Sequence, residues 1–274
     1  MIAPPGDGPI LPLGTGYYRA VADRLLPFLT GRPVFLLRPG RAGSESVRIE
    51  AAAGIAALDE AGRTGLAVPP VDAAGESWFA LRLTVPPWCP FEVVRLSALK
   101  LALVLEDALL EPWFCYDGAG GLTLLWSWGR AEGDDFPEGV EAFHARTGLE
   151  LQQRLERRLA GTPERDRVGR WTGYEGAVSR FDVLGGEPPA GDEAEGTPPV
   201  RLATVGVVPP GRLRVPWSLN EASGRAVRPL SREDLYRFDP EVDAEPDRVK
   251  DIRREFPVPY HPPGTVAREL FAQS

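Results

Sequence analysis

The sequence predicts a mixed α+β fold, with a largely antiparallel sheet flanked by helices and a small N-terminal module. Alternating or continuous apolar segments predict strands at 78–85, 111–117 and 122–128. Apolar residues at helical spacing predict helices at 16–29, 91–110 and 137–160. The last two of these strand segments form a pair of strands around the glycine-rich turn at 117–121. The mixture of helices and strands with hairpins favours a largely antiparallel sheet.

The N-terminal module begins with the helix at 16–29, which ends at the Gly31–Pro33 segment. A buried strand at 34–38 follows, and the alternating residues 46–50 are its expected hairpin partner. In the helix at 137–160, the predicted core-facing residues are Leu149, Leu151, Leu155 and Leu159.

Two further strands are expected at 177–184 and 200–208, on either side of an acidic, flexible loop at 185–199. Ser231 precedes a helix and has the pattern of a capping box. We therefore expect one domain at 1–240, with a module at about 1–75 and a core at about 76–238. A charged, proline-rich tail at 241–274 follows, with one helix near 245–255.

Composition limits the function classes. The net charge of −8 gives no general attraction to nucleic acid, so DNA binding should be weak or absent. No apolar segment could span a membrane, and no signal peptide is evident, so we expect a cytoplasmic protein without a membrane partner.

Cysteine and histidine are scarce, with two of each in the chain. Cys89 and Cys115 lie in apolar surroundings and are expected to be buried thiols. His144 and His261 are expected at the surface. Trp126 and Trp128 share one face of a strand, which is either a buried sheet face or, less favoured, a surface for a partner.

Two segments carry a family resemblance. Residues 17–40, YYRAVADRLLPFLTGRPVFLLRPG, resemble the opening of the primase-polymerase domain of bacterial ligase D, within the archaeo-eukaryotic primase superfamily. Residues 215–230, VPWSLNEASGRAVRPL, resemble that family's later Y-S-L-R segment. The resemblance covers about 16–237 and implies a single primase-polymerase domain with an RRM-like core at about 76–238. It also implies a setting in DNA repair by end joining or in replication.

The same resemblance implies a degenerate active site. The family's metal-binding D-x-D pair falls on Arg82 and Thr84, and its third aspartate falls near Ala203 or Thr204. Its catalytic histidine falls on Thr123. An arginine repels cations, and Mg²⁺ or Mn²⁺ requires oxygen ligands, so we expect no metal cofactor.

We therefore predict no catalysis and an accessory or structural role with a protein partner, such as an active primase-polymerase paralogue or a ligase- or Ku-type assembly. Residues expected to line the vestigial nucleotide cleft are Asp117, Gly118, Gly120, Gly121, Arg214, Ser218 and Asn220.

Two alternatives remain open. Arg82, Arg212, Arg214 and Arg225 could converge in the cleft and bind a nucleotide or nucleic-acid phosphate. Glu132, Asp134 and Asp135 could instead be relocated ligands for Mg²⁺ or Mn²⁺ in an active nucleotidyltransferase.

Overall fold

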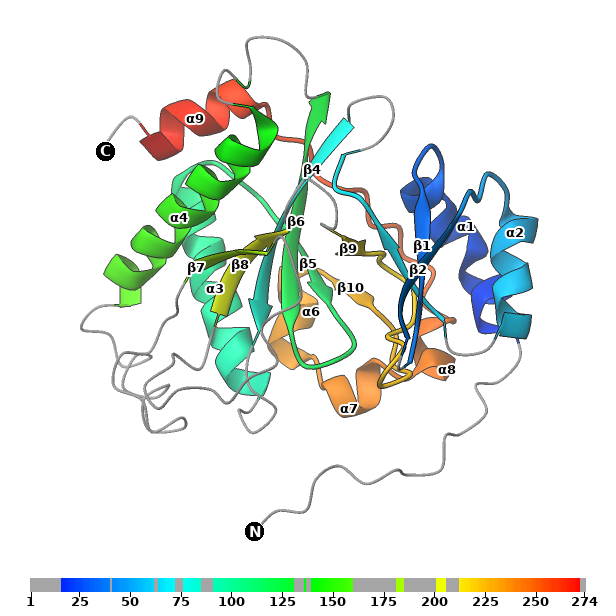
Figure 1. The fold of residues 1–274 in the computed structure, drawn as a ribbon. Helices are drawn as coiled ribbons and strands as arrows, with labels where there is room; N and C mark the ends of the chain where they lie inside the picture. The colour runs from blue at the N-terminus through cyan, green and yellow to red at the C-terminus, as the bar shows by residue number, and fades with distance from the viewer. Residues whose placement is uncertain are drawn as a thin grey trace.

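Two β-sheets and their covering helices make up the fold (Figure 1). The computed structural model describes residues 16–39, 41–61, 64–71, 76–84, 91–130, 136, 139–159, 181–184, 201–205 and 212–271. The larger sheet has six strands in the order β10-β5-β6-β4-β8-β7, and the smaller has four in the order β2-β1-β3-β9.

The six-stranded sheet is antiparallel except where β7 pairs with β8. Its strands are β4 (Glu76–Thr84), β5 (Trp113–Tyr116), β6 (Leu122–Arg130), β7 (Phe181–Leu184), β8 (Arg201–Val205) and β10 (Arg228–Leu230). Helices α3 (Phe91–Asp107) and α4 (Val140–Leu159) cover one of its faces (Figure 1).

The smaller sheet lies toward the other face (Figure 1). Its strands are β1 (Val34–Arg38), β2 (Arg41–Val47), β3 (Gly65–Val68) and β9 (Leu213–Arg214). Its helical neighbours are α1 (Tyr17–Leu29), α2 (Ala52–Ala56) and the 3₁₀ helix η1 (Ala57–Ala61). Because β9 pairs with β3, the N-terminal module is completed by a segment far along the chain.

Side-chain alternation along β4 and β6 gives the larger sheet two different faces. The helix face packs into one apolar core; its residues are Phe79, Leu81, Leu83, Leu122, Leu124, Trp126 and Trp128. The inner face points toward the smaller sheet; its residues include Trp78, Ala80, Arg82, Thr123, Leu125 and Ser127. Trp126 and Trp128 are thus buried, which confirms the favoured prediction and removes them as a partner surface.

The C-terminal segment packs on both cores. It contains α6 (Arg232–Arg237), α7 (Pro240–Asp243), α8 (Pro246–Val249) and α9 (Pro263–Phe271). Val249 is buried in the inner core and Leu270 in the helix-side core. Residues 253–261, which we call the strap, join α8 to α9. The Ser127 amide donates to the Pro259 carbonyl at 2.7 Å, and the His261 amide donates to the Ser127 carbonyl at 2.9 Å.

Helix starts and ends mostly follow the sequence pattern. The capping box is confirmed: the Ser231 hydroxyl accepts from the Asp234 amide at 3.1 Å, and the Asp234 carboxylate accepts from the Ser231 amide at 3.0 Å. None of the helices in the described part of the chain is long and apolar enough to cross a membrane.

Two predictions for α4 are wrong. Leu149 does not face the core, because its side chain is 47% exposed. His144 is not at the surface, because α4 turns it toward the helix face, where it is 1% exposed. Its Nε2 accepts a hydrogen bond from the Trp128 indole at 3.0 Å, and burial lowers the pKa of His144 to about 3.

Candidate functional site

The sheet register brings three of the aligned positions into one row. Arg82 on β4 pairs with Thr123 on β6 and with Ala203 on β8, and Thr123 also pairs with Cys115 on β5. Directly paired residues face the same side of a sheet. The positions that correspond to a metal-binding aspartate, the third aspartate and the histidine are therefore neighbours in the strand register, and Arg82 and Thr123 share the inner face.

Arg82 occupies the centre of this row. Its Nε atom is buried and has no hydrogen-bond partner among the residues that the structure describes. Burial lowers the pKa of Arg82, and the charge of Arg214 adds to this, while the carboxylates of Asp117 and Glu221 oppose it. The centre of the row thus carries a cation balanced by two nearby acids.

Asp117 closes the glycine-rich turn at 117–121 on itself. Its Oδ1 atom accepts hydrogen bonds from the Ala119 amide at 2.8 Å and the Gly121 amide at 2.9 Å. Two amides of the turn therefore point at a carboxylate of the chain itself, which stabilises the turn. Because Gly121 has no side chain, the carboxylate can lie this close: a Cβ there would meet Asp117 Oδ2 at 2.4 Å.

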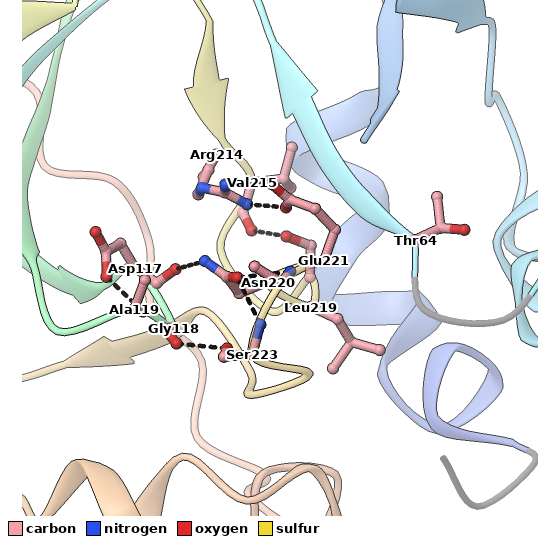
Figure 2. Close-up of polar contacts among 12 residues, drawn as sticks. Thr64, Asp117, Gly118, Ala119, Arg214, Val215, Leu219, Asn220, Glu221 and Ser223 are labelled. Atoms are coloured by element: carbon pink, nitrogen blue, oxygen red, sulfur yellow. Dashed lines mark hydrogen bonds and ion pairs between the residues drawn. The ribbon is translucent and has the colours of Figure 1, made fainter. Parts of the chain in front are cut away.

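Asn220 and Ser223 brace the same turn from the loop that precedes β10 (Figure 2). Asn220 Nδ2 donates to the Asp117 carbonyl at 3.0 Å, and Ser223 Oγ donates to the Gly118 carbonyl at 2.6 Å. Gly118 has φ of +82°, and a Cβ there would lie 2.5 Å from the Asn220 Cβ. The two segments fit only because Gly118 is a glycine.

Arg214 is held by Glu221 across the loop (Figure 2). The two side chains make a bidentate pair, with Arg214 Nη2 at 2.7 Å from Glu221 Oε1 and Nη1 bonded to Oε2. Burial acts to raise the pKa of Glu221, but the hydrogen bonds and charge of Arg214 outweigh it and hold the pKa below its ordinary value. The pair is neutral as a whole.

Ser218 and the two tyrosines of α1 fix the course of the loop. Ser218 is fully buried, and its Oγ donates to the Val215 carbonyl at 2.7 Å. Tyr17 donates to the Trp217 carbonyl at 3.0 Å, and the Tyr18 hydroxyl accepts from the Leu219 amide at 3.2 Å. Tyr17 and Tyr18 belong to the first segment that resembles the family, and residues 218–220 (S-L-N) belong to the second. These two segments therefore contact each other.

The other arginines do not join Arg82. Arg225 is paired with Glu241 and also bonds the Tyr116 hydroxyl. The Arg212 guanidinium lies over the Phe35 ring, 4.2 Å from its centroid. The predicted convergence of four arginines is thus reduced to Arg82 and Arg214, and Arg214 is already paired.

Metal-binding residues do not cluster in the part of the chain that the structure describes. Glu132, Asp134, Asp135 and Cys89 lie outside the described residues. Cys115 is buried, as expected, and burial together with the nearby Asp117 charge raises the pKa of its thiol.

Glu221 and Ser223 are the polar residues of this site that the sequence did not single out. They follow directly after the S-L-N segment. Their position next to Asn220 is the one feature of the sequence from which a role for them at this site could have been predicted.

Comparison with solved structures identifies a protein with a similar fold. The chain is similar to the polymerase domain of Mycobacterium tuberculosis ligase D, which was solved in complex with DNA, at 15% sequence identity and a TM-score of 0.52. The match covers 86% of this chain and 85% of that domain. No protein-family profile matches the chain, and no curated protein matches it. The similarity therefore confirms a mixed α+β, primase-polymerase-like fold.

Proposed function

We propose that this protein is a non-catalytic relative of primase-polymerases that serves as an accessory or structural subunit in DNA end joining or replication. Its partner would be a protein, such as an active primase-polymerase or a ligase- or Ku-type assembly. The observation that carries the proposal is Arg82, a cation at the centre of the row where a nucleotidyltransferase of this fold would bind metal.

Electrostatics support the absence of a metal at this row. A divalent ion beside Arg82 would meet a like charge, and Asp117 and Glu221 already balance the positive charges of Arg82 and Arg214. Moving either carboxylate to a metal would leave an arginine uncompensated in a buried site, which is costly.

The turn at 117–121 supports the same proposal. Amides of such a turn can bind a phosphate oxygen when they are free. Here the amides of Ala119 and Gly121 are already bonded to the Asp117 carboxylate, whose negative charge would also repel a triphosphate.

Calorimetric titration with Mn²⁺, alone and with a nucleoside triphosphate, tests the proposal. The wild-type chain should bind neither. The double variant Arg82→Asp/Thr84→Asp restores two carboxylates to the row and should gain Mn²⁺ binding, whereas Glu233→Gln on α6 is a surface control that should change nothing. Tight Mn²⁺ binding by the wild-type chain would refute the proposal.

A second candidate function, binding of a nucleic-acid phosphate, is favoured by the unpartnered Nε of Arg82 alone. This function requires that a short DNA duplex bind in a salt-dependent manner. Arg82→Gln should weaken that binding, and the control Arg237→Gln, at the exposed end of α6, should leave it unchanged.

The alternative of relocated metal carboxylates rests on residues outside the described part of the chain. It requires metal binding that the double variant Asp134→Asn/Asp135→Asn abolishes.

A further inference from the structure

The strap runs between α8 and α9 and adds to an open edge of the larger sheet (Figure 1). On that side, β5 begins at Trp113, opposite Leu125, and no described strand continues beyond it along β6. The strap takes this place at Ser127, whose amide donates to the Pro259 carbonyl at 2.7 Å and whose carbonyl accepts from the His261 amide at 2.9 Å. Addition of an extended segment to a sheet edge is a common mode of peptide recognition.

Four aromatic side chains form a groove beside the strap, which we call the strap groove. They are Phe28 on α1, Trp78 on β4, Trp113 on β5 and Trp217 in the loop before β10. The Phe28 ring centroid lies 5.9 Å from that of Trp113 and 5.8 Å from that of Trp78. The strap contributes Phe256, whose ring centroid lies 5.4 Å from that of Trp113 and 5.7 Å from that of Trp217. The groove thus receives one aromatic ring from the strap.

The sequence of the strap suits an aromatic groove. Residues 253–261 read RREFPVPYH, so Phe256 is followed by two prolines that alternate with Val258. Proline restricts the backbone of a segment before it docks, and therefore lowers the conformational entropy that is lost on docking. Grooves lined with aromatic side chains recognise proline-containing extended segments in this way. The strap and its groove therefore have the features of a peptide and its binding site within one chain.

The strap is held at few points. Residues 254–258 form no main-chain hydrogen bond to any other residue in the part of the chain that the structure describes. Cavities of about 850 Å³ and about 220 Å³ lie beside the strap, and residues 254–257 line both. Its apolar contacts with the inner core come from Phe256 and Val258, both partly buried. A segment with so few contacts opens at a lower free energy than the core does.

The segments on either side of the strap have packing of their own. Val249 of α8 is buried in the inner core, and Leu270 of α9 is buried in the helix-side core. One end of the strap is also tied by Arg254, whose guanidinium lies 3.3 Å from the Asp234 carboxylate. Release of the strap would therefore expose the strap groove and the edge at Ser127 while α8 and α9 keep their own contacts.

We propose that the strap groove, together with Ser127, binds an extended segment of a partner protein, and that the strap occupies this site in cis until the partner displaces it. The segment has an aromatic residue followed by two alternating prolines, because the site already accepts that pattern from the strap. Its aromatic ring takes the place of Phe256, and its main chain takes both hydrogen bonds of Ser127. The proposal does not depend on whether the Arg82 row is catalytic.

A fluorescein-labelled peptide with the sequence of residues 252–261 is the probe, and its anisotropy measures binding to the full chain. The wild-type chain should bind it weakly, because a tethered competitor is present at a high effective concentration. Phe256→Ala weakens that competitor and should bind the peptide at least about 10-fold more tightly than wild type does. Phe271→Ala is the matched control, because it removes a ring of the same C-terminal segment that packs on the helix-side core instead. Its affinity for the peptide should equal that of wild type.

Arg254→Gln provides a second way to loosen the strap, because it removes an exposed ion pair and keeps the core intact. It should raise the affinity for the peptide by about 2-fold. A peptide whose ring is removed by Phe256→Ala should bind the Phe256→Ala chain at least about 10-fold more weakly than the unchanged peptide does.

Three outcomes would overturn the proposal. The first is no gain of affinity in Arg254→Gln together with no gain, or no folded protein, in Phe256→Ala. The second is equal affinity for the peptides with and without the aromatic ring. The third is a wild-type dimer in sedimentation that Phe256→Ala dissociates, because the strap of a second copy would then be the occupant of the groove.

Discussion

The two faces of the six-stranded sheet differ in what their side chains do. The helix face is a row of apolar side chains, and its titratable neighbour His144 is held neutral. The inner face carries Arg82, and near it lie the Arg214–Glu221 pair and the self-bonded Asp117 turn. Trp78, Ala80 and Leu125 are buried on the inner face as well, so apolar burial on both faces stabilises the fold. The sheet therefore accommodates a row with a cation at its centre.

The largest effect is expected where the inner face depends on a close backbone approach. Gly118→Ala should destabilise the protein by about 3 kcal/mol, because a Cβ would both strain a positive φ and collide with Asn220. Gly120→Ala is the matched control: φ is +101° there, but nothing lies within 4 Å, so about 1 kcal/mol is expected. Denaturant unfolding measures both. Equal losses would mean that the Asn220 contact does not hold the turn.

The helix face should respond to acid through His144. The folded pKa of about 3 lies below the unfolded value of about 6.5, so the unfolded chain takes up a proton that the native chain refuses. The contribution of neutral His144 to the free energy of unfolding is complete above pH 6.5 and is lost as pH falls toward 3. His144→Gln, which can still accept from Trp128, should reduce the loss of unfolding free energy between pH 6.5 and pH 5 by about 2 kcal/mol. An unchanged pH profile would contradict burial of this ring.

The strap should loosen when its contact with β6 is disturbed. A Cβ on Gly129 would lie 2.7 Å from the Tyr260 ring, so Gly129→Ala should displace the strap. Trypsin should then cleave after Arg253 and Arg254 several-fold faster than in wild type. In Gly139→Ala, a control that also has positive φ but has open space around it, cleavage there should be unchanged.

The smallest effect is expected at Leu109, which is 72% exposed and adopts φ of +58° at the end of α3. The Leu110 amide bonds the Leu105 carbonyl at 2.8 Å, a helix ending that favours glycine at position 109. Leu109→Gly should stabilise the protein by about 1 kcal/mol in the same unfolding assay. Loss of stability would show that Leu109 makes a contact that its exposure does not reveal.

Local patterns explain which elements could be predicted from the sequence. The helical spacing of apolar residues predicted the bounds of α1 to within one residue. The Ser231 capping box could be predicted because it involves only residues close together in the sequence. The resemblance aligned Arg82, Thr123 and either Ala203 or Thr204 with the family's site residues, and the strand register makes Arg82, Thr123 and Ala203 neighbours.

Long-range packing explains what could not be predicted. The burial of His144 depends on how α4 lies on Trp128. The strap returns from the C-terminal segment to Ser127, a residue far from it in the chain. Arg214 pairs with Glu221 only because the loop between them folds back on itself. The spacing of apolar residues in the sequence does not predict such a loop. The same holds for the Asp117 turn and its two bracing residues, which lie about 100 positions away in the chain.

Primer extension by the purified wild-type chain, with Mn²⁺ and nucleoside triphosphates, is the most direct measurement of whether the protein is catalytic. With Arg82 at the centre of the row and the 117–121 turn closed by Asp117, we expect no extension above a no-protein control. Metal-dependent extension that Arg82→Gln leaves intact and Asp134→Asn/Asp135→Asn abolishes would contradict the proposed function, because it would show that the metal ligands lie elsewhere in the chain.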